Sequence, residues 1–519
     1  MKKNEISRGT RRIICAFLSL IFITAAFAGG MTASAEGAHD QWVFQAAYTV
    51  TLDDVLYECG SIYHIKPWDD NWEFYSACAV VTGYIGDAEE VVIPSDVGGY
   101  PVKEIETGAF TGASFRKITL PDSLESIRYD SFVDCKNLEV IDLGKGPDTY
   151  HSLLWTSYYG LENTCIFQIC SGCDALKEFR TSPDNPYYST GKYGELIYKN
   201  PENAYMNRVV QFPAAAEVEV YVPERTTYSL SERYWTTTGL FSGENKTLKY
   251  VVGNHLMCCY GGIFAGTGVF AVRLSRNSGL FINSTDFGYM HEYENPIKYV
   301  FYEGTEKIWN TEIHSYGTKT RAETMLDPDV KVIFDAKDAA KVFSDVSADS
   351  WFYGYVDFAM NLGLMKGVSE TKFEPDSPMS RAMLVTVLWR LEGSPDAAAA
   401  PFSDLSESWY ETAVGWAYEN GIVMGATDEE FDPDGDVTRE QISAILKRYA
   451  EFKKMNTDAK ASLDSFSDSG KIEEYARDAM SWAVGVGLVR GVTSRKLDPA
   501  GQATRAQVAT MLMRFLSIG

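Results

Sequence analysis

The stretch that decides the fold runs from Phe343 to Gly393 and reads FSDVSADSWFYGYVDFAMNLGLMKGVSETKFEPDSPMSRAMLVTVLWRLEG. Two sets of apolar residues in it follow the i, i+3, i+4, i+7 spacing of one helix face. The first set is Val356, Ala359, Met360 and Gly363, and the second is Leu384, Val387, Leu388 and Leu391. The stretch therefore predicts two helices, separated by a loop that contains Phe373-x-Pro375.

The same pattern occurs twice more toward the C-terminus. The three units open at Phe343-Ser-Asp, Phe402-Ser-Asp and Phe466-Ser-Asp. In each unit a Gly lies 14 residues before an Arg, and the pairs are Gly367 and Arg381, Gly425 and Arg439, and Gly491 and Arg505. Three copies in the same register indicate a repeated structural module rather than chance similarity.

Each of these Arg residues lies where a helix is expected to begin. The motifs are Ser380-Arg381-Ala382-Met383, Thr438-Arg439-Glu440-Gln441 and Thr504-Arg505-Ala506-Gln507. The Ser or Thr suits an N-cap, which is worth about 1 kcal/mol, and a Gln at the third position can complete a capping box. A cation at this end of a helix opposes the helix dipole. The three Arg residues therefore call for a functional explanation.

The three units resemble S-layer homology (SLH) modules, at residues 343–394, 402–452 and 463–516. Modules of this family bind secondary cell-wall polysaccharides that often bear pyruvate ketals. The resemblance implies that Arg381, Arg439 and Arg505 hold a sugar-linked carboxylate. Helix N-terminal N–H groups can form an anion site, and an adjacent guanidinium can bind a carboxylate through two bonds.

The resemblance implies further polysaccharide-binding residues, each with a structural alternative. Trp351 and Trp409 occupy matching positions, where an aromatic face can line a sugar pocket, or where a plain core residue would also fit. The Asp residues of the opening motifs can accept sugar hydroxyls or cap a helix, and the module Gly residues permit close approach of the backbone. These Asp and Gly residues are Asp345, Asp404, Asp468, Gly367, Gly425 and Gly491.

The three units depart from one another at several of these positions. The third unit has Tyr475 where the others have Trp, and Met383 stands where the other units have a Gln that can close a capping box. Lys366 and Arg490 precede the Gly of the first and third units, whereas the second has Met424. We expect three pockets of unequal affinity, which can still anchor firmly because linked sites bind almost intramolecularly.

A different repeat occupies the earlier part of the chain. Ile105 and Ile127 are 22 residues apart, as are Phe110 and Phe132, and Ile118 and Ile141 are 23 apart. Each unit predicts a short strand and a compact turn that cannot bury their apolar face alone, so the units must stack into a solenoid.

The strings VVIPSDVGGYPVKEIETGAF and KITLPDSLESIRYDSFVDCKNLEVIDL resemble the leucine-rich repeats of BspA-type bacterial surface proteins. We assign residues 79–334 to this solenoid, 36–78 to an N-terminal cap and 335–342 to a linker. Residues 184–198 resemble the insert that such proteins carry between repeats, and residues 299–309 resemble the closing segment. Together the two repeats predict a multidomain α+β protein, with an irregular leucine-rich-repeat β-solenoid followed by a helix-rich, pseudo-threefold triple module.

Composition limits the function classes. The chain has 519 residues and a net charge of −24, which excludes a generally basic nucleic-acid binder. Residues 1–35 have the basic, apolar and small-residue regions of a secretory signal peptide, which predicts secretion to the cell wall or S-layer surface and no membrane attachment after cleavage. Their removal takes away five basic residues and one acidic residue, which leaves a net charge of −28.

Eight Cys residues would remain in the mature chain, among them Cys165, Cys170 and Cys173. A closed zinc site needs four ligands, and no matching Cys or His pair lies nearby. Cys135 and Cys173 fit the Cys-x-x-Leu positions of the leucine-rich repeats, so we expect structural thiols, no metal and no cofactor. The acidic loop at residues 432–436 lacks the Gly and Glu that an EF-hand requires.

The sequence supports three functional hypotheses. The preferred one is a surface protein anchored non-covalently to wall polysaccharide, with a solenoid displayed for adhesion to an unknown protein or glycan. The alternatives are a wall-anchored hydrolase, for which no catalytic motif was found, and a structural S-layer component. Residues 343–519 carry 17 basic and 27 acidic residues, so bulk attraction cannot hold an anionic polymer. Recognition must therefore be local, and weakly sensitive to salt.

Overall fold

The computed structural model describes residues 41–65, 72–128, 130–146, 169–199, 208–222, 245–253, 264, 267–276, 297–312 and 329–518. The predicted signal peptide and Cys165, Cys258 and Cys259 lie outside these ranges. The chain divides into two compact units. The described part of the smaller unit is residues 41–45, 61–65 and 72–76, where the rings of Tyr63 and Phe74 meet edge to face at 6.0 Å between centroids. The features below belong to the larger unit, apart from the parts of the first three strands that lie within these three ranges.

The N-terminal sheet contains strands of both the predicted cap and the first repeat. Its strands are β1 (Gln41–Leu52), β2 (Val55–Ile65), β3 (Trp72–Tyr84), β5 (Asp96–Val97), β6 (Tyr100–Ile105) and β8 (Ser126–Ile127). β3 pairs in parallel with β6 through residues 79–81, and β6 pairs in parallel with β8. The predicted cap boundary at residue 78 therefore falls inside a continuous strand, because the cap and the first repeat share this sheet.

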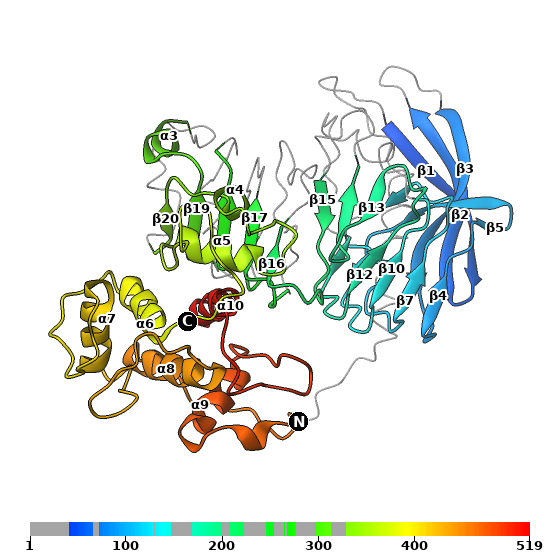
Figure 1. The fold of residues 1–519 in the computed structure, drawn as a ribbon. Helices are drawn as coiled ribbons and strands as arrows, with labels where there is room; N and C mark the ends of the chain where they lie inside the picture. Colours follow the sequence, from blue (N-terminus) through cyan, green and yellow to red (C-terminus); the bar gives the residue numbers. More distant parts are fainter. Residues whose placement is uncertain are drawn as a thin grey trace, which may run out of the picture. The chain divides into compact units, whose positions relative to one another are not determined.

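The first solenoid segment is a parallel ladder of short strands, which Figure 1 shows side by side. Its strands are β4 (Glu90–Val92), β7 (Lys117–Thr119), β10 (Val140–Asp142) and β12 (Glu178–Arg180). Ile118 pairs with Ile141 in register, and both are fully buried. Phe110 and Phe132 stack with centroids 5.0 Å apart. The 22- and 23-residue spacings thus place equivalent residues on one another, as predicted for a solenoid.

A second, shorter ladder and an antiparallel insert complete the turns of this segment. β9 (Phe132–Val133) pairs in parallel with β11 (Cys170–Ser171). The insert consists of β13 (Tyr188–Thr190), β14 (Leu196–Tyr198) and β15 (Arg208–Gln211), which form an antiparallel sheet. This sheet covers most of the predicted insert and interrupts the parallel repeats.

The solenoid resumes as a five-stranded parallel sheet. Its strands are β16 (Val220–Tyr221), β17 (Tyr250–Gly253), β18 (Ala271–Leu274), β19 (Tyr299–Tyr302) and β20 (Lys331–Ile333). In the closing segment, α3 (Glu306–Glu312) places Trp309 against Tyr302, with ring centroids 5.1 Å apart. Tyr188, Tyr221 and Tyr250 are buried, so these tyrosines pack between repeats and are not free to contact a partner.

The described cysteines are buried in the larger unit's core. They are Cys59, Cys78, Cys135, Cys170 and Cys173. Cys135 donates to the carbonyl of Phe110 and Cys173 to that of Phe132, so the two thiols occupy equivalent places in successive repeats. Burial is thus their structural role, which confirms the expectation for Cys135 and Cys173.

The C-terminal region is helical, and its core is shared by all three modules. We call residues 343–394, 402–452 and 463–516 modules 1, 2 and 3. Their helices are α5 (Tyr353–Asn361) and α6 (Arg381–Leu391), α7 (Ser408–Glu419) and α8 (Arg439–Phe452), and α9 (Glu474–Gly485) and α10 (Arg505–Leu516). α6 packs on α7, α8 on α9, and α10 returns to α5. This closed order confirms the pseudo-threefold bundle. None of the helices in the described residues is long and apolar enough to cross a membrane.

The predicted linker contains a short helix that packs on module 1. Helix α4 (Ala339–Val342) is N-capped by Asp338, and its Ala339 N–H donates to the Asp357 carboxylate at 3.0 Å. The 335–342 segment is therefore a fixed part of the junction with module 1, because a buried carboxylate holds its backbone.

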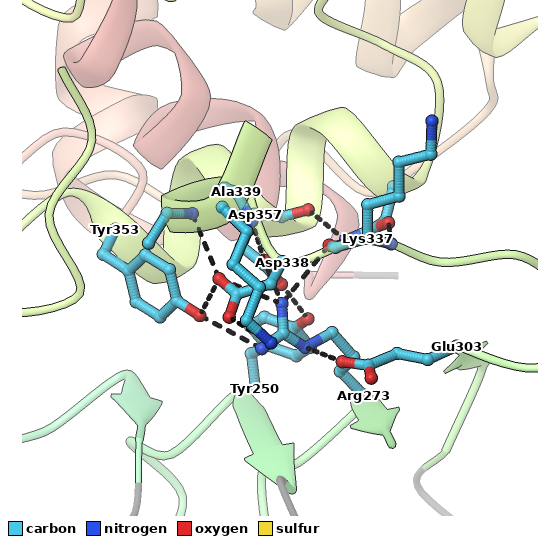
Figure 2. Close-up of polar contacts among 11 residues, drawn as sticks. Tyr250, Arg273, Glu303, Lys337, Asp338, Ala339, Tyr353 and Asp357 are labelled. Atoms are coloured by element: carbon cyan, nitrogen blue, oxygen red, sulfur yellow. Dashed lines mark hydrogen bonds and ion pairs between the residues drawn. The ribbon is translucent and has the colours of Figure 1, made fainter. Parts of the chain in front are cut away.

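Asp357 is the centre of a buried polar network that joins module 1 to strands β17 and β18 (Figure 2). The carboxylate is 0% exposed, is paired with the guanidinium of Arg273, which is 1% exposed, and accepts a hydrogen bond from the Tyr250 hydroxyl at 2.7 Å. Arg273 also donates to the Tyr353 hydroxyl at 3.1 Å. Burial raises the pKa of Asp357, and the Arg273 cation acts in the opposite direction.

Candidate ligand-binding junctions between the modules

Each motif Arg crosses from its own module to the next one. Arg381 donates through Nε to the carbonyl of Phe431 at 2.8 Å and through Nη2 to that of Met424 at 3.0 Å. Arg439 makes the same two bonds to Leu497 and Arg490, both at 2.8 Å. We call the sites that result junctions 1–2 and 2–3.

Arg505 completes the circle by reaching back to module 1. It donates to the carbonyls of Phe373 and Lys366 at 2.8 and 2.7 Å, which defines junction 3–1. Arg381 and Arg505 also lie over the rings of Phe431 and Phe373, at 4.7 and 4.6 Å from the centroids. Leu497 replaces that Phe at junction 2–3. The predicted binding arginines therefore also hold the three modules together.

The guanidinium groups keep donors that the protein does not use. An Arg side chain has five N–H donors, and the two carbonyls take only one from Nε and one from Nη2. Among the described residues, Nη1 of Arg381 and Arg439 has no hydrogen-bond partner, and Nη1 of Arg505 meets only the Met383 sulfur at 3.9 Å. The outer Nη1 and Nη2 edge is thus free to bind a carboxylate through two bonds. Burial lowers the pKa of all three groups, yet an Arg stays charged.

The helix N-termini do not supply the predicted anion site. The N–H groups of Arg381 and Ala382 donate to the carbonyls of Gly435 and Pro433 in module 2, and the other two motif helices make the equivalent bonds to the next module. The third N–H of each helix donates to the N-cap Ser or Thr. This part of the prediction is wrong, because the neighbouring module already uses the donors that a bound anion would need.

The three opening-motif Asp residues clamp the loop that precedes each motif helix. Asp345 accepts from the N–H groups of Phe373 and Glu374 at 3.0 and 2.8 Å, and Asp404 and Asp468 accept equivalent pairs. Burial acts to raise the pKa of Asp345 and Asp468, but these backbone hydrogen bonds outweigh it, so the pKa of both groups is lowered. None of the three side chains makes a capping hydrogen bond to a helix. Their loop role needs no ligand, and contact with polysaccharide stays a prediction.

The module glycines are also explained by packing within each module. A Cβ on Gly425 would lie 2.1 Å from the Thr427 carbonyl oxygen and 2.6 Å from the Phe402 ring. Gly367 and Gly491 face the same kinds of atoms in their own modules. No larger side chain fits there, so these residues shape the loops whose carbonyls the arginines bind. Their direct role toward a ligand stays a prediction.

The aromatic residues at matching positions are exposed rather than in the core. Trp351 is 61% exposed, Trp409 is 46% exposed and Tyr475 is 55% exposed. The pKa of Tyr475 is raised by burial and by the carboxylates of Glu440 and Glu473, and the cations Arg381 and Arg448 offset only part of this rise. Tyr475 of module 3 thus lies near the guanidinium at junction 1–2. The structural alternative for Trp351 and Trp409, a plain core role, is therefore wrong.

The differences between the modules have visible consequences. Thr438 and Thr504 form complete capping boxes with Gln441 and Gln507. Ser380 caps only the Met383 N–H, as the sequence predicts for a module that lacks the Gln. The methionine sulfur instead lies against Arg505. The three junctions are therefore equivalent in their backbone and different in the side chains around them.

A second set of arginines, one in each module, was not predicted from the sequence. Arg390 and Arg514 each donate to the carbonyl that starts their own module's Gly loop, that of Leu364 or Leu488. Arg448 occupies the same helix position in module 2, nine residues after its motif Arg. The constant spacing of nine in all three units was the available signal. Besides burial, the Arg448 and Arg514 cations help to lower the pKa of Arg381 and Arg439, so junctions 1–2 and 2–3 each have a second arginine from the following module.

Comparison with known families agrees with this architecture. The S-layer homology domain model matches residues 342–382, 401–442 and 465–509. The model of the BspA-type leucine-rich repeat region matches residues 87–179. The chain therefore contains a BspA-type leucine-rich repeat region and three S-layer homology domains. This is the domain composition of an S-layer-associated cell-surface protein.

Curated relatives share about a third of the chain. An endoglucanase of Bacillus sp. (strain KSM-635) is 32% identical over 185 residues, which cover 35% of this chain and 19% of the relative. The S-layer protein sap of Bacillus anthracis is 26% identical over 179 residues, or 34% of this chain and 21% of the relative. The chain thus matches only about a fifth of the length of these relatives.

Solved structures of similar proteins are bacterial leucine-rich repeat proteins. A leucine-rich cell surface protein from Faecalibacterium prausnitzii aligns over 53% of this chain and 100% of its own, with 12% identity and a TM-score of 0.17. A leucine-rich repeat protein from Eubacterium ventriosum aligns over 47% of this chain and 65% of its own, with 12% identity and a TM-score of 0.24.

Proposed function

We propose that the three modules anchor this protein non-covalently to secondary cell-wall polysaccharide, through the junctions between modules. The observation that carries the proposal is at junction 1–2, where the exposed Tyr475 lies near the partly unused guanidinium of Arg381, and Trp351 and Trp409 are exposed at the equivalent positions of their modules. The aromatic face suits the apolar face of a pyranose, and the free Nη edge suits a carboxylate such as that of a pyruvate ketal. The match of all three modules to the S-layer homology domain model supports the same assignment, because modules of this family bind polysaccharides of this class.

We further propose that the solenoid is displayed for adhesion or protein binding and is not itself catalytic. Its repeats carry a surface ladder of ion pairs, in which Arg116, just before β7, bridges Glu89 and Glu139, just before β4 and β10, and Lys177 also pairs with Glu139. Such a polar, regular surface suits recognition of a partner. The relatives include an endoglucanase, so hydrolysis of wall polymer or a glucan by the full chain is the result that would contradict this part.

The exposed aromatics provide the test of anchoring. The variant Trp351→Ala/Trp409→Ala/Tyr475→Ala removes contact area without removing a core residue, so we expect an unchanged melting temperature. Retention on purified bacterial cell walls should fall by about 100-fold, because each lost aromatic contact costs about 1 kcal/mol or more and the loss of multivalency adds to it. The matched control replaces the exposed Tyr75, Val92 and Tyr418 with Ala. Equal retention of the two variants would remove the junction assignment.

A further inference from the structure

One carboxylate of the solenoid reaches the C-terminal modules. Glu219 directly precedes β16, and its side chain is only 5% exposed. Its backbone carbonyl accepts from the N–H groups of Lys249 and Tyr250 at 2.8 and 3.0 Å, which fixes the residue to strand β17. The side chain is therefore presented by a hydrogen-bonded sheet edge rather than by a loop.

The Glu219 carboxylate is bound by three side chains from two modules. Arg490 Nη2 of module 3 lies 2.8 Å from Oε1, and Arg514 Nε of module 3 lies 2.9 Å from Oε2. The Tyr355 hydroxyl of module 1 donates to Oε2 at 2.7 Å. Two guanidinium groups and one hydroxyl thus hold a single buried carboxylate, which is the arrangement expected of an anion site.

These three side chains belong to junction 2–3. The carbonyl of Arg490 accepts the Nη2 bond of Arg439. Burial is the largest cause that lowers the pKa of Arg439, and the Arg514 cation lowers it further. The two guanidinium groups are therefore close. The ring of Tyr355 lies 6.4 Å from that of Trp351, the exposed aromatic of module 1. Glu219 therefore lies beside the groups proposed to bind the polymer.

The face of module 1 that meets the solenoid is specialised for this contact. A Cβ on Gly354 would lie 2.2 Å from a methyl carbon of Val220, so only Gly lets α5 approach the residue after Glu219 this closely. The positions equivalent to Gly354 hold Thr412 and Asp478 in the other modules. The positions equivalent to Tyr355 hold Ala413 and Ala479. Modules 2 and 3 could not accept the solenoid in this way.

We propose that Glu219, held by Arg490, Arg514 and Tyr355 beside Arg439, blocks the entry of a ligand carboxylate to junction 2–3, so that this chain binds wall polymer through junctions 1–2 and 3–1 while its own solenoid closes the third. The inference rests on the anchoring function proposed above. A tethered carboxylate competes with a free one at a high effective concentration. A ligand carboxylate must displace Glu219 before it can bind at junction 2–3, whereas the other two junctions are open.

The test compares single aromatic variants of the full chain for retention on purified cell walls. With Glu219 in place, Trp409→Ala and Tyr475→Ala should each lower the apparent affinity by about tenfold, and Trp351→Ala should lower it by less than about twofold. In a Glu219→Ala background, Trp351→Ala should cost as much as Trp409→Ala, because junction 2–3 is then open. Glu219→Ala alone should strengthen retention.

Two further variants keep the outcome decisive. Glu219→Gln preserves the volume and removes the charge, so it replaces Glu219→Ala if that variant does not fold. Glu217→Gln removes an exposed charge on the same segment and should leave retention unchanged. An equal loss for Trp351→Ala and Trp409→Ala with Glu219 intact would overturn the inference and leave anchoring standing. No loss for any aromatic variant would instead overturn the anchoring function, and the inference with it.

Discussion

Replacing Asp357 with Ala is expected to lower the free energy of unfolding of the C-terminal region by roughly 3–5 kcal/mol, the usual cost of removing one partner of a buried ion pair. Arg273, with 1% of its side chain exposed, would lose its closest counter-ion and keep only the longer pairs with Glu303 at 3.7 Å and Asp338 at 3.8 Å. The Tyr250 hydroxyl would lose its acceptor, and the Ala339 N–H would lose its contact with the carboxylate. Denaturant unfolding followed by tryptophan fluorescence measures the effect.

The control for this prediction is Asp349→Ala, which removes an exposed carboxylate from the same module and should change stability by less than about 0.5 kcal/mol. A double variant, Arg273→Met/Asp357→Leu, should recover most of the loss, since two apolar side chains leave no buried charge behind. A loss below about 1 kcal/mol for Asp357→Ala would show that the solenoid and module 1 do not depend on this network.

The second large effect is expected from the triple variant Arg381→Ala/Arg439→Ala/Arg505→Ala. Each substitution leaves a carbonyl of a buried residue, Phe431, Leu497 or Phe373, without its donor, at about 1–3 kcal/mol for each unsatisfied group. Retention on purified cell walls should be lost even at temperatures where the variant is still folded, because the N–H donors for the ligand carboxylate are also gone. Thermal unfolding and retention are measured on the same preparation.

A charge-matched variant separates local recognition from bulk attraction. Lys372→Ala/Arg477→Ala/Arg495→Ala also removes three positive charges, all from exposed side chains. We expect it to be retained like the unchanged protein, since the region is acidic overall. If both triple variants lost retention equally, binding would depend on overall charge and the role of the junction arginines would be wrong.

The sequence predicted the features that repeat. The 22- and 23-residue spacings placed Phe110 on Phe132 and Ile118 beside Ile141. The constant position of Trp351, Trp409 and Tyr475 indicated a shared role, and their exposure agrees with ligand contact. Equal spacing carries this information because stacked or rotated copies bring equivalent residues to equivalent places.

The partners of these residues could not be predicted from spacing alone. The bond from Arg505 to Phe373 joins residues 132 apart, and the one from Arg514 to Glu219 joins residues 295 apart. Periodicity within one unit does not show which neighbour a side chain will meet. For the same reason the helix N-termini looked available for an anion, although carbonyls of the next module bind them. Besides the spacing of nine between the arginines, a second readable signal was missed, since Asp357 stands where the other modules have Gly415 and Ser481.

The central claim is that the modules hold the protein to the wall through its secondary polysaccharide. The most direct measurement is retention of the full chain on purified cell walls before and after chemical removal of that polysaccharide, with the peptidoglycan left intact. Anchoring through the junctions predicts strong retention before removal, and loss of retention after it. Equal retention on the stripped walls would contradict the account.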